Sequence, residues 1–286
     1  MRFTLGIHNY NFYFAFIKLR AYFYKLRTSL TKIMTITSTA TKYRHWHLAA
    51  LIFTCFFSVF TASAKKNPRV LIFSKTAGFH HQSIAKGIAA IQKLGRNSGF
   101  DTDTTTDTRL FNIDNLKKYA AVVFLSTTGD ILNDQQQIAF ESYIRSGGGF
   151  AGVHAATDCE YDWPWYGNLV GAYFVSHPQQ QEAVLKVHNQ KHLATRHLPR
   201  EWKRKDEWYN FKWVSPNLNV LISLDETSYQ PGRNKMGENH PMSWYHEYDG
   251  GRSFYTALGH TDESYIDPMF LQHLLGGIKY AIGYKK

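Results

Sequence analysis

Apolar and polar positions alternate in blocks along the part of the chain that follows residue 64. Short and almost continuously apolar runs predict strands that are covered on both faces. These runs occupy residues 69–74, 120–126 and 148–153, and a threonine-rich strand is predicted over residues 100–106. Glycines and small residues crowd residues 147–158 (GGGFAGVHAATD), which predicts that the third run leads into a sharp turn with His154 at its tip.

Helical spacing separates these strands. Apolar side chains recur at intervals of three or four over residues 84–94, and Ser83 can cap the helix that they predict. A second helix is predicted to begin at Asp134, to form a capping box with Gln137 and to end near Ser146. Strands that alternate with helices predict a parallel sheet with right-handed crossovers, and ligands bind such sheets at the carboxyl edge.

The second half of the chain has a different pattern, which predicts mainly strands. Residues 249–251 (Asp-Gly-Gly) predict a hairpin turn between the last two of them. A closing helix is expected over residues 265–283. The predicted strands are residues 182–187, 207–214, 219–224, 242–248 and 252–258. We therefore predict one α/β domain over residues 65–286, with a mixed sheet and a β-rich excursion.

Charge divides the chain at residue 64. The formal net charge is +11, but residues 1–64 carry eight Lys or Arg and no acidic residue, which leaves +3 for the remainder. An interspersed charge of this size gives no electrostatic footprint for nucleic acid, and we predict no nucleic-acid partner.

Residues 34–64 have the pattern of a signal peptide. Basic residues precede a thirteen-residue apolar run over residues 48–60, and residues 62–64 (Ala-Ser-Ala) match a small-x-small cleavage site. The run is shorter than the roughly 20 residues that span a bilayer, although an uncleaved anchor is the alternative. We predict that Met34 is the true start, that residues 1–33 lie upstream of it, and that cleavage follows Ala64. The protein would then be periplasmic or extracellular, without a membrane partner.

One cysteine, Cys159, remains after residue 64. A single cysteine cannot form an internal disulfide, so the hydrophobic core must stabilise the domain alone. Because Cys159 lies five residues beyond the turn tip, we interpret it as a buried thiol rather than a nucleophile.

Histidines in loops are the main candidates for chemistry. His81, His154 and His260 each follow a predicted strand, so parallel strands would bring the three imidazoles to one edge of the sheet. Convergent neutral imidazoles suit zinc or a similar divalent ion, and they could instead act as general acid and base near neutral pH. The alternative is that they only cap loops. We interpret His188 and His192 as exposed.

Two further segments could contact a substrate. Asp206, Glu207 and Tyr209 lie together and could bind sugar hydroxyls or handle a proton, although the adjacent basic run favours a solvated strand start. Trp163 and Trp165 flank a proline, and their rings suit either a pyranose or the core.

Several ordered motifs together resemble the ThuA-like (trehalose utilisation) family over residues 69–284. The motifs are TAGFHHQSI, GGGFAGVHAATD, WPWYGNLVGAYFVSHP, DEWY, HPMSWYHEYDGGRSFYTALGH and DPMFLQHLLGGIKYA. The resemblance implies a class I glutamine amidotransferase-like fold, a flavodoxin-like three-layer sandwich with added strands. In amidotransferases the turn holds a catalytic cysteine; His154 replaces it here, so glutaminase activity is not expected.

The resemblance also implies a function in catabolism of trehalose-like disaccharides or keto-glycosides. One departure from the family pattern is that His80 and Gln82 stand where an Arg and an Asp are expected, which leaves the orientation of His81 to a neutral amide. The positions that match the family motifs are His81, His154, Asp206, Glu207, Tyr209, His240 and His260.

These observations give one main hypothesis, an exported sugar-modifying hydrolase, lyase or isomerase with a small carbohydrate as its substrate. The alternative is a carbohydrate-binding protein without chemistry, and the oligomeric state stays open. The predicted catalytic residues are His154, His260 and Glu207. The predicted substrate-binding residues are Asp206, Tyr209, Trp163, Trp165 and His240. A divalent metal, with zinc preferred, is assigned to His81, His154 and His260.

Overall fold

The computed structural model describes residues 66–284. The predicted leader, its start at Met34 and its cleavage after Ala64 therefore lie outside the described residues. None of the helices within residues 66–284 is long and apolar enough to cross a membrane.

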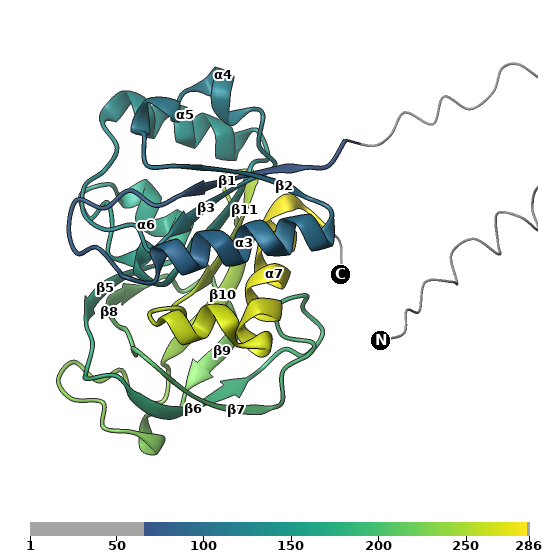
Figure 1. Cartoon of the computed structure of the whole chain (residues 1–286). Helices are drawn as coiled ribbons and strands as arrows, with labels where there is room; N and C mark the ends of the chain where they lie inside the picture. The colour runs from purple at the N-terminus through teal and green to yellow at the C-terminus, as the bar shows by residue number, and fades with distance from the viewer. Residues whose placement is uncertain (1–65, 285–286) are drawn as a thin grey trace, which may run out of the picture. The chain divides into compact units, whose positions relative to one another are not determined.

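A nine-stranded mixed sheet forms the centre of the fold, with strand order β2-β1-β3-β4-β11-β10-β9-β6-β7 (Figure 1). The first five strands in this order are parallel. They are β2 (Asp101–Thr105), β1 (Arg69–Phe73), β3 (Ala121–Leu125), β4 (Gly149–Val153) and β11 (Gly251–Thr256). The other four continue the sheet in antiparallel fashion. They are β10 (Pro241–Tyr248), β9 (Asn219–Leu224), β6 (Gln181–Val187) and β7 (Glu201–Asp206).

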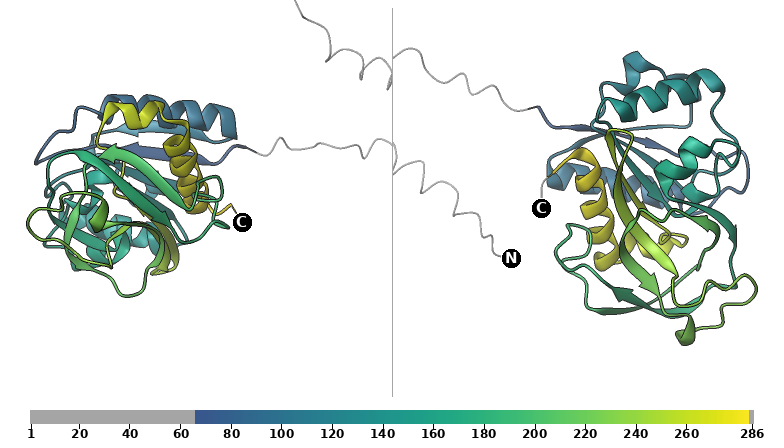
Figure 2. Two further views of the ribbon diagram at one scale, coloured as in Figure 1. Left: turned by 90° about the horizontal axis from the view of Figure 1, so that it is seen from below. Right: turned by 180° about the vertical axis from the view of Figure 1, so that it is seen from behind.

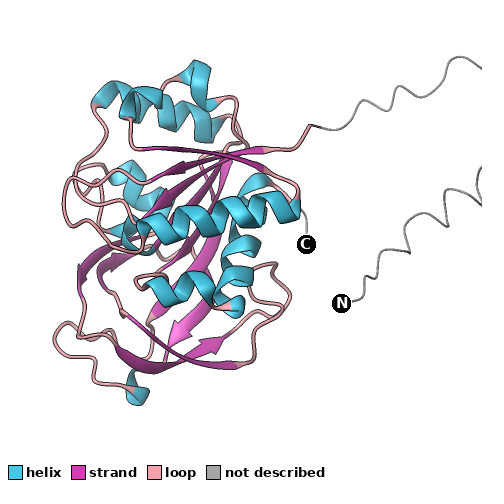
Figure 3. Ribbon diagram, viewed as in Figure 1, coloured by secondary structure: helices cyan, strands magenta, loops and turns pink. Residues whose placement is uncertain are grey.

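Helices cover both faces of the parallel half of the sheet and make a three-layer sandwich (Figures 2 and 3). One face carries α3 (Ile84–Ser98) and α7 (Pro268–Ile282), which pack on each other. The opposite face carries α4 (Ile113–Leu116), α5 (Asp134–Arg145) and α6 (Pro164–Val170). Four 3-10 helices lie between these elements: η1 (Thr108–Leu110), η2 (His154–Thr157), η3 (Glu226–Ser228) and η4 (Asp262–Ile266). A separate pair, β5 (Ala172–Ser176) and β8 (Asn210–Val214), is antiparallel.

Burial explains why these segments form strands. Every residue of β3 and β4 is buried, because helices cover both faces of the central strands. The edge strand β2 is intermediate or exposed throughout, and this fits its run of Thr and Asp. The predicted α/β class with a mixed, mainly parallel sheet is confirmed, as is the hairpin between β10 and β11.

The predicted strands of the second half of the chain need correction. The strand predicted over residues 207–214 begins only at Asn210, and a separate strand, β7, ends at Asp206. The basic run that favoured a solvated segment belongs to β7, where Lys203 and Lys205 are exposed while Arg204 and Asp206 point inward. The strand β5, which pairs with β8, was not predicted.

Helices α3 and α5 begin at Ile84 and Asp134 as predicted, but their capping contacts differ from the prediction. The capping box of α5 is formed by Asn133 and Gln136, one residue earlier than predicted, because Asn133 already has the extended backbone that a capping residue needs. Ser83 precedes α3 but does not cap it; its hydroxyl donates to the carbonyl of Gly259 at 3.3 Å. That hydrogen bond ties the start of α3 to the loop after β11. The closing helix is shorter than expected, since η4 precedes it.

Candidate functional site

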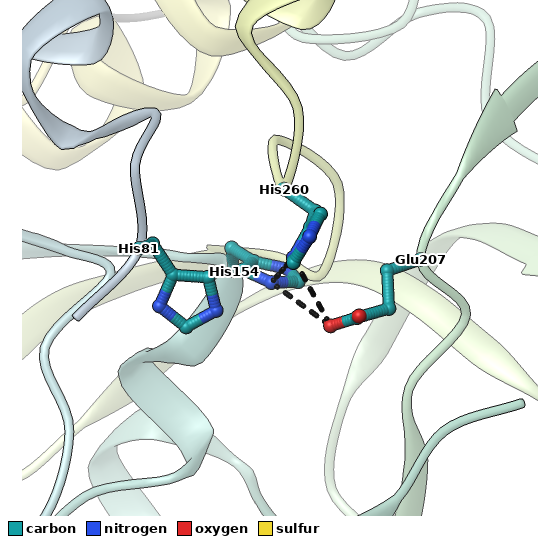
Figure 4. Close-up of side chains that lie close together, drawn as sticks. All are labelled: His81, His154, Glu207 and His260. Carbon is teal, nitrogen blue, oxygen red and sulfur yellow. Dashed lines mark hydrogen bonds and ion pairs between the residues drawn. The ribbon is translucent and has the colours of Figure 1, made fainter. Parts of the chain in front are cut away.

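Four side chains converge at the carboxyl edge of the parallel strands (Figure 4). His81 lies in the loop after β1, His154 follows β4 directly, His260 follows β11, and Glu207 follows β7. One ligand atom from each lies within 4.8 Å of the others, and three of the four residues are buried. We call these four residues the His–Glu cluster. The predicted convergence of the three histidines is confirmed.

The backbone at the turn tip fixes His154. Its φ of 51° lies in the left-handed region, which a residue with a Cβ adopts only when its surroundings hold it there. The carbonyl of His154 accepts a hydrogen bond from the hydroxyl of Tyr255 at 2.7 Å. Its ring atom Nδ1 lies 2.8 Å from the carbonyl oxygen of Ala257, so Nδ1–H donates and Nε2 keeps its lone pair. The lone pair is therefore presented to the cluster.

Three atoms form a tight triangle within the cluster. His154 Nε2 lies 3.0 Å from His260 Nδ1, and Glu207 Oε2 lies 3.1 Å from His260 Nδ1 and 3.5 Å from His154 Nε2. Donors bonded to a tetrahedral ion at about 2.1 Å are separated by about 3.4 Å. Three imidazoles and one carboxylate are also ligand types that divalent transition metals accept. The cluster can thus hold a metal ion.

His81 completes the cluster as a neutral ring. It is buried, and its ring centroid lies 4.8 Å from that of His154 and 5.2 Å from that of His260. Burial, followed by the neighbouring His154 and His260, lowers the pKa of His81 to about 3. A neutral imidazole is the form that binds a metal. Gln82, which stands where the family pattern has an Asp, is exposed.

Glu207 and His260 shift each other's protonation. Burial opposes ionisation of Glu207, but the neighbouring imidazole of His154 and the hydrogen bond from His260 outweigh it and hold the pKa of the carboxyl well below its usual range. Burial lowers the pKa of His260, whereas its hydrogen bond to Glu207 and the charge of that carboxylate raise it by more. The pair therefore keeps the carboxyl of Glu207 ionised and makes the imidazole of His260 more basic than an isolated histidine.

Asp206 positions the cluster rather than joining it. It is fully buried, and Oδ1 accepts from the backbone amides of Glu207 at 3.0 Å and His260 at 3.1 Å. Oδ2 accepts from the amide of Gly259 at 3.1 Å and from Arg204 at 2.9 Å. We predicted that this carboxylate binds substrate, but both of its oxygens accept hydrogen bonds from backbone amides of two loops. The sequence preference for a solvated strand start at this position was wrong.

Tyr209 and His240 lie behind the cluster. The ring of Tyr209 is buried and packs on His154, with centroids 4.3 Å apart. His240 is also buried; its Nε2 lies 2.7 Å from the carbonyl oxygen of Tyr209 and its Nδ1 lies 2.9 Å from Glu226 Oε1. Because both ring nitrogens of His240 have protein neighbours, the structure places it as support for Tyr209, outside the four residues of the cluster.

His177 is a residue that the predicted site lacked. Its Nδ1 lies 3.3 Å from Glu207 Oε1 and 2.9 Å from the carbonyl oxygen of Pro178, and 42% of its side chain is exposed. Its ring stacks with that of Tyr209 at 6.1 Å. The loop setting before a proline was visible in the sequence, but no strand was predicted before it. His177 connects the buried carboxylate to solvent.

The two tryptophans predicted for substrate binding pack among other aromatic side chains. Trp163 stacks on Trp165 at 5.2 Å and on Tyr166 at 5.7 Å, and its indole N–H donates to Glu141. Trp165 donates to Asp249. The structure does not place either ring in the His–Glu cluster, and these contacts agree with the packing alternative.

Two remaining interpretations have different outcomes. Cys159 is fully buried, and burial raises the pKa of its thiol, as expected for a structural cysteine. His188 is exposed as predicted, but His192 is fully buried and stacks on Tyr245 at 4.4 Å, so its predicted exposure was wrong.

Comparison with known proteins places this geometry in context. Residues 69–281 match the family model ThuA, described as trehalose utilisation. A ThuA-like structure from Bacteroides uniformis is 24% identical with a TM-score of 0.65, covering 80% of this chain and 97% of its own. A ThuA-like structure from Parabacteroides merdae is 22% identical with a TM-score of 0.61, and the match covers 76% of this chain and 91% of that protein. Similarity at this identity shows the fold. No curated protein matches the sequence.

Proposed function

Since the chain belongs to the ThuA family of trehalose utilisation, we propose that it is a metal-dependent enzyme of carbohydrate catabolism. The observation that carries the proposal is the His–Glu cluster, in which four ligand atoms lie within 4.8 Å of one another at the ligand-binding edge of the sheet. The substrate class is a trehalose-like disaccharide or keto-glycoside, and the reaction is a hydrolysis, elimination or isomerisation.

His81, His154, His260 and Glu207 would hold the ion, with zinc as the preferred metal for this donor set. Zinc would supply Lewis acidity, which polarises a carbonyl and acidifies a hydroxyl. The hydrogen bond from His154 Nδ1 to Ala257 fixes the tautomer and the orientation of that ligand.

Proton transfer falls to residues at the rim of the cluster. His177 is half exposed and lies 3.3 Å from the second oxygen of Glu207, so it can carry a proton between the buried carboxylate and solvent. Tyr209 packs over His154 and shields that side of the cluster from water. His177 thus joins the proposed catalytic residues His154, His260 and Glu207.

A carbohydrate-binding protein without chemistry is the less favoured alternative. It was based on a stacking surface at Trp163 and Trp165, whose ring contacts are with core side chains. Buried, mutually coupled titratable groups are typical of sites that carry out chemistry.

Metal content and turnover test the proposal together. Purified full-length protein is dialysed against chelator, reloaded with zinc, and assayed for zinc and for conversion of trehalose and its 3-keto derivative. We expect about one zinc per chain, and His154→Ala should lose both the zinc and the conversion. His188→Ala, an exposed histidine outside the cluster, serves as the matched control and should retain both. A zinc-free wild type, or conversion that survives His154→Ala, would contradict the proposal.

We also propose that the protein is exported and that the mature chain begins at Lys65. The proposal rests on the basic residues, apolar run and Ala-Ser-Ala site of residues 34–64. N-terminal sequencing of protein from the native host tests it. A first residue upstream of Met34, or intact protein in the cytosolic fraction, would contradict export.

A further inference from the structure

A polar pocket of about 320 Å³ opens beside the His–Glu cluster. His260 belongs to both, so a molecule in the pocket would reach an imidazole of the proposed metal centre. Its other lining residues come from the loop that precedes α3, the segment before β6 and the start of η4. Those that matter here are Phe79, Gln82, Gln180, Asp262 and Glu263.

Phe79 gives the pocket an exposed aromatic surface. Its side chain is 67% exposed although its loop is firmly held. The amide of Ala77 donates to the carbonyl of Thr128 at 2.8 Å, and the hydroxyl of Thr128 donates to the carbonyl of Phe79 at 2.9 Å. The ring also contacts His81 edge to face, with centroids 4.9 Å apart. The fold thus holds a large apolar ring in water beside the cluster.

The polar groups of the pocket are amides and carboxylates. Gln82 and Gln180 offer neutral donors and acceptors, and Asp262 and Glu263 offer acceptors. Oδ1 of Asp262 is buried and has no hydrogen-bond partner among the described residues. Hydrogen bonds from its own backbone amide and from Thr261 lower the pKa of Glu263, so its carboxylate is ionised at neutral pH. Among residues 66–284, no Lys or Arg lines the pocket, although the charges of Lys86 and Lys205 reach Glu263.

We propose that this pocket binds the sugar ring of the substrate and selects neutral over phosphorylated sugars, with Phe79 as the stacking surface. An aromatic face with surrounding amides and carboxylates matches a sugar, which has C–H faces and hydroxyl edges. Sugar hydroxyls can donate to the carboxylate of Glu263 and exchange hydrogen bonds with Gln82 and Gln180, whereas a phosphate group brings negative charge to a pocket lined by two acidic side chains. The inference deepens the proposed function and rests on its carbohydrate part.

Calorimetric titration of the zinc-loaded full-length protein tests the stacking surface. The ligands are trehalose, maltose and sucrose as neutral disaccharides. Phe79→Ala should weaken binding by roughly fivefold because the stacking contact is lost, and Phe79→Tyr should restore it. Ile138→Ala on α5 removes a side chain of similar exposure, 62%, and should leave the affinity unchanged. Unchanged affinity in Phe79→Ala, or no binding of all three sugars by the wild type, would overturn the inference.

Trehalose 6-phosphate tests the charge selection. We expect it to bind at least roughly tenfold more weakly than trehalose, and Asp262→Asn should narrow that difference. The proposed selection against phosphorylated sugars would be overturned if the wild type bound trehalose 6-phosphate as tightly as trehalose or more tightly. It would also be overturned if the ratio of the two affinities were the same in Asp262→Asn as in the wild type. Zinc content is measured in the same samples. Sugar binding that depends on Phe79 in a protein without zinc would reject the metal centre and leave the pocket standing.

Discussion

Two structural devices hold three of the four ligands of the His–Glu cluster. A left-handed backbone and two hydrogen bonds hold His154. The buried carboxylate of Asp206 holds the backbone of both Glu207 and His260. Such outer contacts fix the geometry of a site before a ligand arrives, and their loss weakens metal sites even when every ligand remains.

Asp206→Asn is therefore expected to impair the site without touching a ligand. The substitution removes the carboxylate that faces Arg204 at 2.9 Å and leaves Asp267 at 3.3 Å as the remaining charged partner, so the free energy of unfolding should fall by about 2 kcal/mol. Zinc affinity should fall by roughly 10- to 100-fold. Glu182→Gln breaks an exposed pair with Lys203 on the neighbouring strand and should change the free energy of unfolding by less than about 0.5 kcal/mol. Urea unfolding and zinc titration of both variants check this, and equal stabilities would contradict it.

The sequence indicated the cluster residues because strand ends are visible in it. His81, His154 and His260 each follow an apolar run, and parallel strands bring their ends to one edge. Whether a side chain enters the site or supports it depends on contacts across the sheet, which no local pattern encodes. Asp206 and His240 were assigned to substrate for that reason, and the structure shows them hydrogen-bonded to protein.

At the scale of elements, apolar runs were the main signal for strands, although the threonine-rich β2 was also recognised. β3 and β4 read as continuous apolar runs because both faces are covered. β7 was missed because two of its three inward residues, Arg204 and Asp206, are charged, so no apolar alternation marks it. The inward charges are tolerated because they pair with each other.

Helix α7 packs so closely that two of its positions require glycine. A Cβ at Gly276 would lie 2.3 Å from the carbonyl oxygen of Leu193, and one at Gly277 would lie 2.1 Å from the ring of Phe254. Gly276→Ala should thus destabilise the protein by about 1–3 kcal/mol through overpacking, although alanine is the better helix former. Gln272→Ala at an exposed position of α7 should be neutral or slightly stabilising. Thermal unfolding distinguishes them, and a stabilised Gly276→Ala would show that the helix can shift.

Over the whole molecule, several buried histidines are neutral. Burial lowers the pKa of His240, His246 and His273, and for His273 the pKa falls to about 3. A histidine whose folded pKa is lowered is protonated more readily in the unfolded chain. Its contribution to stability is therefore present above a pH of about 6.5 and is lost as the pH falls below that value.

His273 provides the test of this pH dependence. When the pH falls from 7 to 5, the lowered pKa of His273 should reduce the free energy of unfolding of the wild type by about 2 kcal/mol. Its Nδ1–H donates to the carbonyl of Ala194 at 2.8 Å, and the amide of His273→Gln can replace that donor without titrating. The variant should show a correspondingly smaller loss of stability between the two pH values in urea unfolding. Identical losses in both proteins would contradict the assignment.

The central claim is that the His–Glu cluster is a metal centre, and the location of a bound ion tests it most directly. Crystals of the full-length protein loaded with one equivalent of zinc are measured on both sides of the zinc absorption edge. We predict one strong anomalous peak per chain, within about 2.0–2.2 Å of ligand atoms of His81, His154, His260 and Glu207. Absence of a peak between these four side chains, or a peak only at other residues, would contradict the account.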